Sequence, residues 1–194
     1  SFTDAASLPV AVATGYDGVH QLDLPSGTTL LVTGAGGGVG VAAVQVARAV
    51  GLRVIGVASE GKKDLVESLG AVHVPSGPGL AGRLAAVLAE GGHRLGGVYD
   101  LVGGDVLEAA ASLLDDPTGA LISAADWETV ARLGGASVVR VRTAAVLDAV
   151  AALVVSGAVT PHVTRTFPLE RAGDALRAVE GGHSRGKIVI EMGG

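Results

Sequence analysis

The chain has 194 residues, a formal net charge of −5 and 48% hydrophobic residues, and only 3% of its residues are aromatic. An acidic chain without a cluster of Lys and Arg disfavours nucleic acid and anionic membrane surfaces as partners. The chain has no cysteine, which excludes disulfide bonds and thiolate metal sites, and no apolar run approaches the roughly 18 residues of a membrane span. No signal peptide opens the sequence, so we expect a cytoplasmic protein.

The opening segment, Asp4–Leu22, has the apolar spacing of a helix, and we expect Pro9 to break that helix. Proline lacks the backbone N–H group and its ring collides with the preceding turn. We separate this region, residues 1–24, from a domain that we place at residues 25–160.

A glycine-rich turn directly follows a short apolar strand. The strand reads TLLVT (residues 29–33), and a helical pattern over Val41–Val50 comes after the turn. Strand, tight turn and helix together direct free backbone N–H groups and the positive helix end at a phosphate. The candidate residues of this phosphate loop are Gly34, Gly37, Gly38, Val39 and Gly40.

Strand-like runs then alternate with helical patterns. After the first strand, the expected strands are Arg53–Ala58, Val72–Val74, Gly97–Val102, Ala120–Ser123 and Ser137–Arg142. The expected helices between and after them are Lys62–Leu69, Gly82–Ala89, Asp105–Leu114, Asp126–Leu133 and Ala144–Val155. This alternation predicts an α/β fold with a doubly wound, parallel, six-stranded Rossmann sheet.

The tail, residues 161–194, lies outside the alternation. It reads as an extended piece from Thr164, a helix over Leu169–Val179 and a strand at Lys187–Glu191. Because the six-stranded sheet is already complete, we expect the final strand to pack against another part of the protein.

Two other phosphate-binding loops fit the sequence less well. A P-loop needs Gly-Lys-Ser/Thr, which does not follow the glycines. The pattern TGxxxGxG of short-chain dehydrogenases is present, but those enzymes also need a Tyr-x-x-x-Lys pair for proton donation. The two tyrosines are followed at the fourth position by His20 and Gly103, so this alternative lacks its catalytic residues.

Taken together, three motifs resemble the medium-chain dehydrogenase/reductase superfamily, in its zinc-independent quinone oxidoreductase and enoyl reductase branch. They are LPVAVATGYDGV (8–19), PSGTTLLVTGAGGGVGVAAVQVARAVG (25–51) and ESLGA (67–71). The tail motifs FPLE (167–170) and RGKIVI (185–190) are similar to the C-terminus of that family. The resemblance implies an N-terminal catalytic domain that this chain does not contain. Residues 1–24 would link to that domain, and residues 161–194 would belong to it or pack near it.

The end of the second strand favours NADP over NAD. NAD-selective folds place Asp or Glu there to bind the ribose 2′-hydroxyl, whereas this chain has Ala58. By resemblance, Ser59 and Lys62 bind the 2′-phosphate of NADP(H). The alternative is that Lys62 and its neighbour Lys63 are solvated charges at a helix start.

The nicotinamide end is expected at the carboxyl ends of the fourth and fifth strands. The resemblance assigns Val102 and Gly103 after one strand, and Ser123 and Ala124 after the other. It also places Thr14 beside the nicotinamide, although this hydroxyl could equally bond to its own preceding helical turn. No catalytic residue is assigned, and the five scattered histidines do not have metal-ligand spacing.

The predicted function is the NADP(H)-binding portion of an oxidoreductase that transfers a hydride to a small electrophilic substrate, namely a quinone, an enone or an enoyl thioester. The alternatives are a nucleotide-binding or scaffold module without catalysis, and an enoyl reductase domain cut from a polyketide synthase. Whether the chain forms a homodimer also stays open, because the segment Ser137–Ala151 is shorter than the dimer-forming region of the family.

Overall fold

The computed structural model describes residues 1–118, 120–181 and 185–192, so residues 182–184 and 193–194 of the predicted tail lie outside the described part. The main sheet contains β1 (Thr29–Thr33), β2 (Arg53–Ala58), β3 (Val72–Pro75), β4 (Leu95–Asp100), β5 (Leu121–Ser123) and β6 (Ala136–Ser137). The strand order is β3-β2-β1-β4-β5-β6, and all neighbours are parallel. This arrangement confirms the predicted doubly wound Rossmann sheet.

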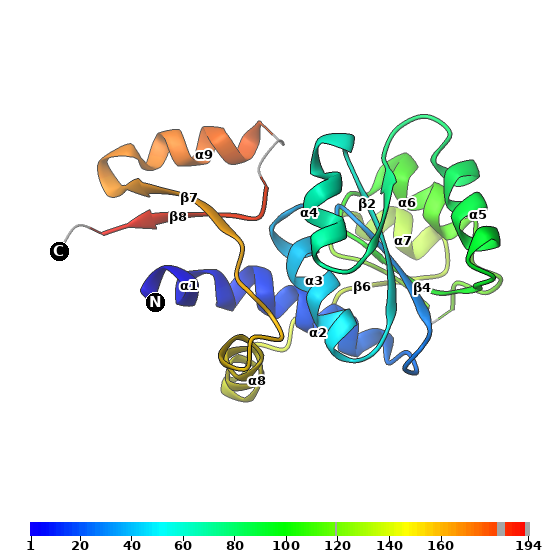
Figure 1. Ribbon diagram of the computed structural model, residues 1–194, viewed down its shortest axis with the longest axis horizontal. Helices are drawn as coiled ribbons and strands as arrows, with labels where there is room; N and C mark the ends of the chain where they lie inside the picture. The colour runs from blue at the N-terminus through cyan, green and yellow to red at the C-terminus, as the bar shows by residue number, and fades with distance from the viewer. Residues whose placement is uncertain (119, 182–184, 193–194) are drawn as a thin grey trace.

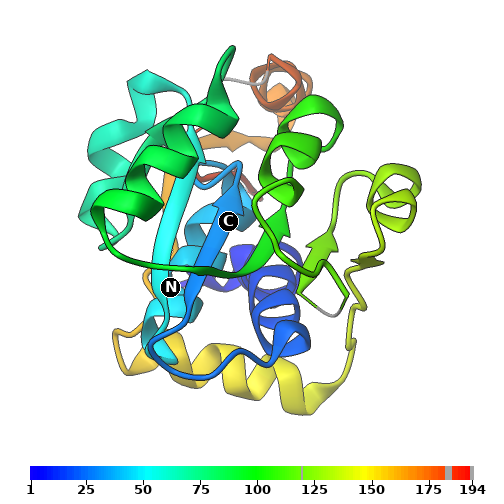
Figure 2. The same cartoon turned by 90° about the vertical axis from the view of Figure 1, so that its right-hand side faces the viewer.

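Helices cover both faces of the sheet (Figures 1 and 2). One face carries α2 (Ala13–Leu22), α3 (Gly38–Ala49) and α4 (Lys63–Ser68), and the other carries α5 (Leu80–Glu90), α6 (Gly104–Ala111) and α7 (Trp127–Arg132). Successive strand residues point to opposite faces, so Leu30 and Val32 join the first core while Leu31 joins the second. All of β1 is buried, as expected for a central parallel strand.

The predicted break at Pro9 is wrong. The chain runs from α1 (Phe2–Ser7) through a π-helical turn, η1 (Leu8–Val12), into α2 without interruption. Pro9 lies in the first turn of η1, and the N–H group of Ala13 bonds to the carbonyl oxygen of Leu8, five residues earlier. The wider turn accommodates the proline, so the helix continues instead of ending.

The predicted strand Ser137–Arg142 is also wrong, because β6 contains only Ala136 and Ser137. Beyond β6, side chains of α2 take the hydrogen-bonding places that a neighbouring strand would fill. Gln21 accepts from the N–H group of Val139, and Asp17 accepts from that of Val141. The segment therefore follows α2 and leaves the sheet.

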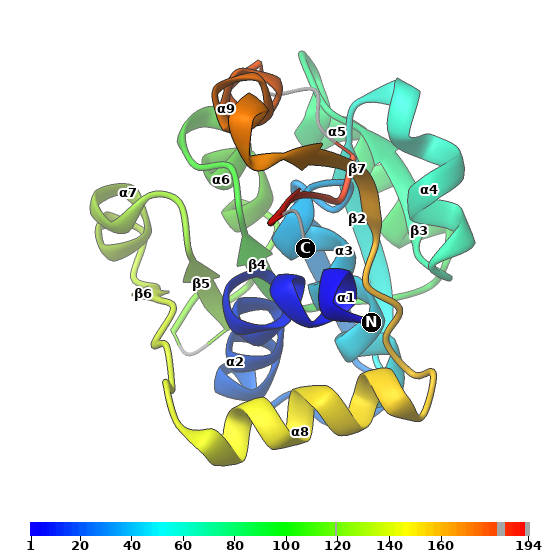
Figure 3. The ribbon, with the colours of Figure 1, turned by 90° about the vertical axis from the view of Figure 1, so that its left-hand side faces the viewer.

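The tail forms a separate layer. It contains β7 (Val163–Pro168), the 3₁₀ turn η3 (Leu169–Arg171), α9 (Ala172–Glu180) and β8 (Lys187–Glu191). Strands β7 and β8 pair in parallel as a two-stranded sheet, and α1 lies against both strands (Figures 1 and 3). A parallel bridge between Gly37 and Gly186 connects this layer to the phosphate loop.

Helix α8 (Ala144–Val155) joins the two layers and lies across the outside of η1 and α2 (Figure 3). The side chain of Thr143 caps its first turn by accepting from the N–H group of Val146. Its buried contact is made by Val150, which packs into the core around α2 and α3. Within the described residues, no helix is long and apolar enough to span a membrane.

Candidate functional site

The glycine loop between β1 and α3 has the geometry of a phosphate cradle. Gly34 turns the chain with a φ of +64°, a conformation that favours glycine, and its carbonyl accepts from the N–H group of Gly37 at 2.9 Å. Helix α3 begins at Gly38, so its first amides, which include those of Gly38 and Val39, have no acceptor within the helix. These N–H groups and the positive helix end suit an anion.

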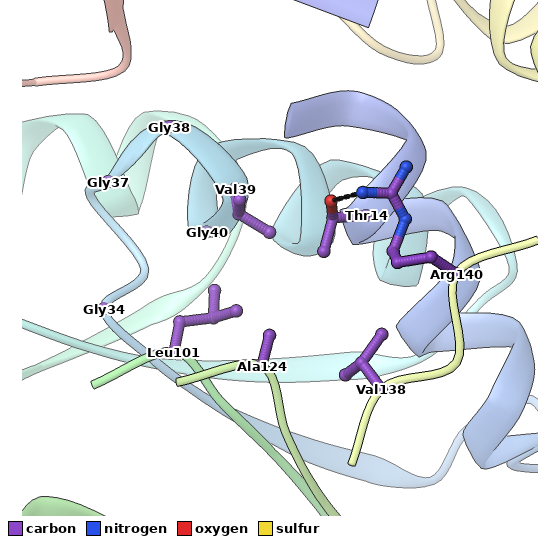
Figure 4. A pocket seen from close by; sticks show the side chains of 10 residues that line it. All are labelled: Thr14, Gly34, Gly37, Gly38, Val39, Gly40, Leu101, Ala124, Val138 and Arg140. Carbon is purple, nitrogen blue, oxygen red and sulfur yellow. Dashed lines mark hydrogen bonds between the residues drawn. The ribbon is translucent and has the colours of Figure 1, made fainter. Parts of the chain in front are cut away.

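A cleft of about 470 Å³ runs from this loop across the carboxyl ends of the strands (Figure 4). Its floor comes from residues that directly follow three strands, namely Leu101 after β4, Ala124 after β5 and Val138 after β6. The complete lining is Thr14, Gly34, Gly37, Gly38, Val39, Gly40, Leu101, Ala124, Val138 and Arg140. Ligands of open α/β sheets bind at this edge.

The structure brings most of the predicted site residues together. Those that line the cleft are Thr14, Gly34, Gly37, Gly38, Val39, Gly40 and Ala124. Those that do not line it are Ser59, Lys62, Val102, Gly103 and Ser123. A contact between any of these residues and a cofactor stays a prediction.

Gly103 and Ser123 instead support the site through Asp100, at the end of β4. The buried carboxylate of Asp100 accepts from the hydroxyl groups of Thr33 and Ser123, both at 2.6 Å. It also accepts from the backbone N–H groups of Val102 and Gly103. One carboxylate therefore fixes the ends of β1, β4 and β5 against one another.

Asp100→Asn should lower the free energy of unfolding by about 2 kcal/mol. Each group that faces this carboxylate is a donor, so an amide NH₂ group would place a donor against a donor. Urea unfolding measures the change, with the exposed Asp105→Asn in α6 as the control. Equal stabilities of the two variants would contradict the supporting role of Asp100.

Two cationic side chains, Lys62 and Arg185, lie beside the glycine loop, near the end of β2. Ser59 precedes the 3₁₀ turn η2 (Glu60–Lys62). The side chain of Lys62 packs against the loop, because a Cβ atom at Gly36 would lie only 2.6 Å from Cδ of Lys62. Arg185 donates to the carbonyl of Gly61. Burial, and then the charge of Arg185, lower the pKa of Lys62 below its ordinary value. Positive charge is therefore concentrated next to the phosphate loop.

Three residues that line the cleft were not predicted from the sequence. Leu101 and Val138 could have been found, because they come directly after strands at the edge where ligands bind. Arg140 was not expected there, because it lies within the predicted strand Ser137–Arg142. Its Nε atom donates to Asp17 at 2.9 Å, and its Nη1 atom donates to Thr14 Oγ1 at 2.6 Å (Figure 4).

Comparisons with known proteins agree with this geometry. The family model described as "Zinc-binding dehydrogenase" matches residues 69–190. The chain is 32% identical over 207 residues to the spectinabilin polyketide synthase system protein NorB of Streptomyces orinoci, over 99% of this chain and 9% of that protein. It is 30% identical over 223 residues to a mitochondrial NAD(P)H oxidoreductase of Bos taurus, over 98% of this chain and 56% of that protein.

Among solved structures, the quinone oxidoreductase from Coxiella burnetii is 27% identical and superposes with a TM-score of 0.79, over 95% of this chain and 59% of that chain. The chain thus spans about half the length of single-enzyme relatives and a small part of the polyketide synthases. The described residues do not fit a zinc site, because the sequence has no cysteine and no three His, Asp or Glu side chains of the described part come together.

Proposed function

Because the chain belongs to the zinc-binding dehydrogenase family, among the medium-chain dehydrogenases and reductases, we propose that it is the NADP(H)-binding portion of a reductase. The complete enzyme transfers a hydride from NADPH to an enoyl thioester, an enone or a quinone. The observation that carries this proposal is the cleft between the glycine loop and the carboxyl ends of β4, β5 and β6. The polyketide synthase relatives and the quinone oxidoreductase neighbour support these substrate classes.

The chain's own residues bind and orient the cofactor. The amides of Gly38 and Val39 would hold the pyrophosphate, and Leu101, Ala124 and Val138 would form the apolar part of the nicotinamide site. When bound, the cofactor supplies the hydride. These apolar side chains would exclude water from the ring.

The proton that completes the reduction comes from outside this lining. Among the residues that line the cleft, Thr14 and Arg140 carry the polar side-chain groups. The hydroxyl proton of Thr14 is already donated to the carbonyl of Val10, and an arginine does not deprotonate in proteins. Solvent or the remainder of the enzyme therefore protonates the product.

The preference for NADPH over NADH rests on the end of β2. Ala58 stands where NAD-selective folds have a carboxylate, and Lys62 and Arg185 place positive charge nearby. A 2′-phosphate held by these side chains would relieve the repulsion between the two cations, because it carries negative charge. The lowered pKa of Lys62 means that its positive charge is lost at a lower pH than that of an ordinary lysine. The preference for NADPH should therefore weaken as the pH rises into the alkaline range.

Lys62→Met should weaken NADPH binding by about tenfold and leave NADH binding unchanged, because only NADPH carries the 2′-phosphate. Fluorescence titration with each nucleotide measures the affinities. Lys63→Met is the matched control, because this exposed neighbour pairs with Glu67 and should not change the preference.

Titration of the wild-type chain with NADPH and NADH tests the proposal itself. Saturable binding with a preference for NADPH supports it. The absence of binding to either nucleotide would overturn it, whereas a preference for NADH would overturn only the roles of Ser59 and Lys62.

A further inference from the structure

Thr14 and Arg140 meet at the end of the cleft that lies away from the phosphate loop (Figure 4). Thr14 comes from α2, and Arg140 comes from the segment that follows β6. Their hydrogen bond, from Nη1 of Arg140 to Oγ1 of Thr14, is 2.6 Å long. The pair therefore brings together two distant parts of the chain. It forms a polar group beside Val138, whereas the floor of the cleft is apolar.

The hydroxyl group of Thr14 can only accept from a ligand in the cleft. Its single proton is donated to the carbonyl of Val10 in the preceding helical turn. A hydroxyl oxygen has two lone pairs, and Arg140 occupies one of them. One lone pair of Oγ1 is left, and it needs a donor.

The guanidinium group of Arg140 can only donate. It has five N–H groups. Nε donates one to Asp17, Nη1 donates one to Thr14, and Nη2 donates one to the carbonyl of Pro9. Among the described residues, these bonds leave one N–H group on each terminal nitrogen. The bond to Asp17, whose side chain is only 1% exposed, holds the guanidinium group in place.

We propose that Thr14 and Arg140 together bind the carboxamide of the nicotinamide ring, an inference that rests on the proposed function. The NH₂ group of the carboxamide donates to Thr14 Oγ1, and its carbonyl oxygen accepts from an N–H group of Arg140. A primary amide satisfies both the acceptor and the donor at once. The reacting carbonyl group of a quinone, an enone or an enoyl thioester has no N–H group and would leave Thr14 unused. Contact at both atoms of the amide holds the ring against rotation about its glycosidic bond.

Calorimetric titration of the full chain with two oxidised cofactors tests the Thr14 contact. The first is NADP⁺, and the second is its 3-acetylpyridine analogue, which replaces the NH₂ group by a methyl group and keeps the carbonyl and the charge. The wild-type chain should bind NADP⁺ about three to ten times more tightly than the analogue. Thr14→Val should bind both with the weaker affinity, while Thr14→Ser, which keeps the hydroxyl group, should restore the difference.

The nicotinic acid analogue of NADP⁺ tests the Arg140 contact, because its carboxylate accepts strongly from a guanidinium group. Replacement of Arg140 by Gln should lower the affinity for this analogue, and the loss should be about tenfold larger than the loss of affinity for the 3-acetylpyridine analogue. The doubly substituted chain Asp17→Asn/Arg140→Gln should show the same selective loss. In that chain no buried carboxylate is left unpaired, so the result does not depend on misfolding.

Binding of 2′,5′-ADP separates this inference from the proposed function. This fragment occupies only the adenosine end, so every variant should bind it as the wild-type chain does. If 2′,5′-ADP binds but the wild-type chain does not distinguish NADP⁺ from the 3-acetylpyridine analogue, the carboxamide assignment is wrong and the proposed function stands. If Thr14→Val still distinguishes them, the assignment is equally wrong. Failure of NADP⁺ and 2′,5′-ADP to bind would overturn both.

Discussion

Gly40→Ala is expected to destabilise the chain by roughly 3 kcal/mol and to abolish NADPH binding. A Cβ atom at position 40 would lie 2.1 Å from the carbonyl oxygen of Gly34 and 2.7 Å from Cα of Ala35. Both contacts are backbone atoms of the phosphate loop, so no side chain can rotate away to make room. Helix α3 must shift away from β1, and its first amides would no longer point at the pyrophosphate.

Urea unfolding and NADPH titration together measure this effect. A loss of about 3 kcal/mol is a large fraction of the 5–15 kcal/mol that stabilises an ordinary domain. Gly82→Ala in α5 is the matched control, because a Cβ atom there meets nothing within 4 Å. That variant should gain up to about 1 kcal/mol, since alanine favours a helix more than glycine does. A Gly40→Ala chain that kept wild-type stability and affinity would show that the close approach of α3 is not required.

The phosphate loop could be predicted because its signals are local. The strand over residues 29–33, the glycines after it and the following helix are adjacent in sequence, and their order alone determines where the amides point. The end of β2 could also be predicted, because the alternation of strands and helices places Ala58 at the end of the strand and Ser59 directly after it. Local pattern was therefore sufficient to predict the glycine loop, the helix after it and the end of β2.

The other end of the cleft depends on long-range contacts that no local pattern contains. Arg140 bonds to Asp17, 123 positions earlier in the chain, and this contact bends the segment away from the sheet. The alternating Val and Arg residues around it indicate a strand when they are read alone. Pro9 is a different case, because the wider π-helical turn accommodates the proline ring and the helix continues through it. Tertiary contacts overrode local strand preference in the segment after β6.

Arg140→Met should lower the free energy of unfolding by about 3 kcal/mol. The substitution removes the cation that faces Asp17, a carboxylate with only 1% of its side chain exposed. A buried charge without its partner is more costly than no charge at all. The 20% exposure of Arg140 lets some water reach the pair, which keeps the expected loss at the lower end for buried pairs.

A double-mutant cycle distinguishes the lost charge from lost packing. Asp17→Asn keeps an acceptor for the N–H group of Val141 and removes the negative charge, so the chain with both substitutions should regain at least about 1 kcal/mol relative to Arg140→Met. The exposed pair of Arg132 and Glu108 provides the control, and Arg132→Met should cost less than about 0.5 kcal/mol. If the effects at positions 17 and 140 were additive, the two residues would not act as an ion pair. The position of Arg140 in the cleft would then depend on the packing of its side chain alone.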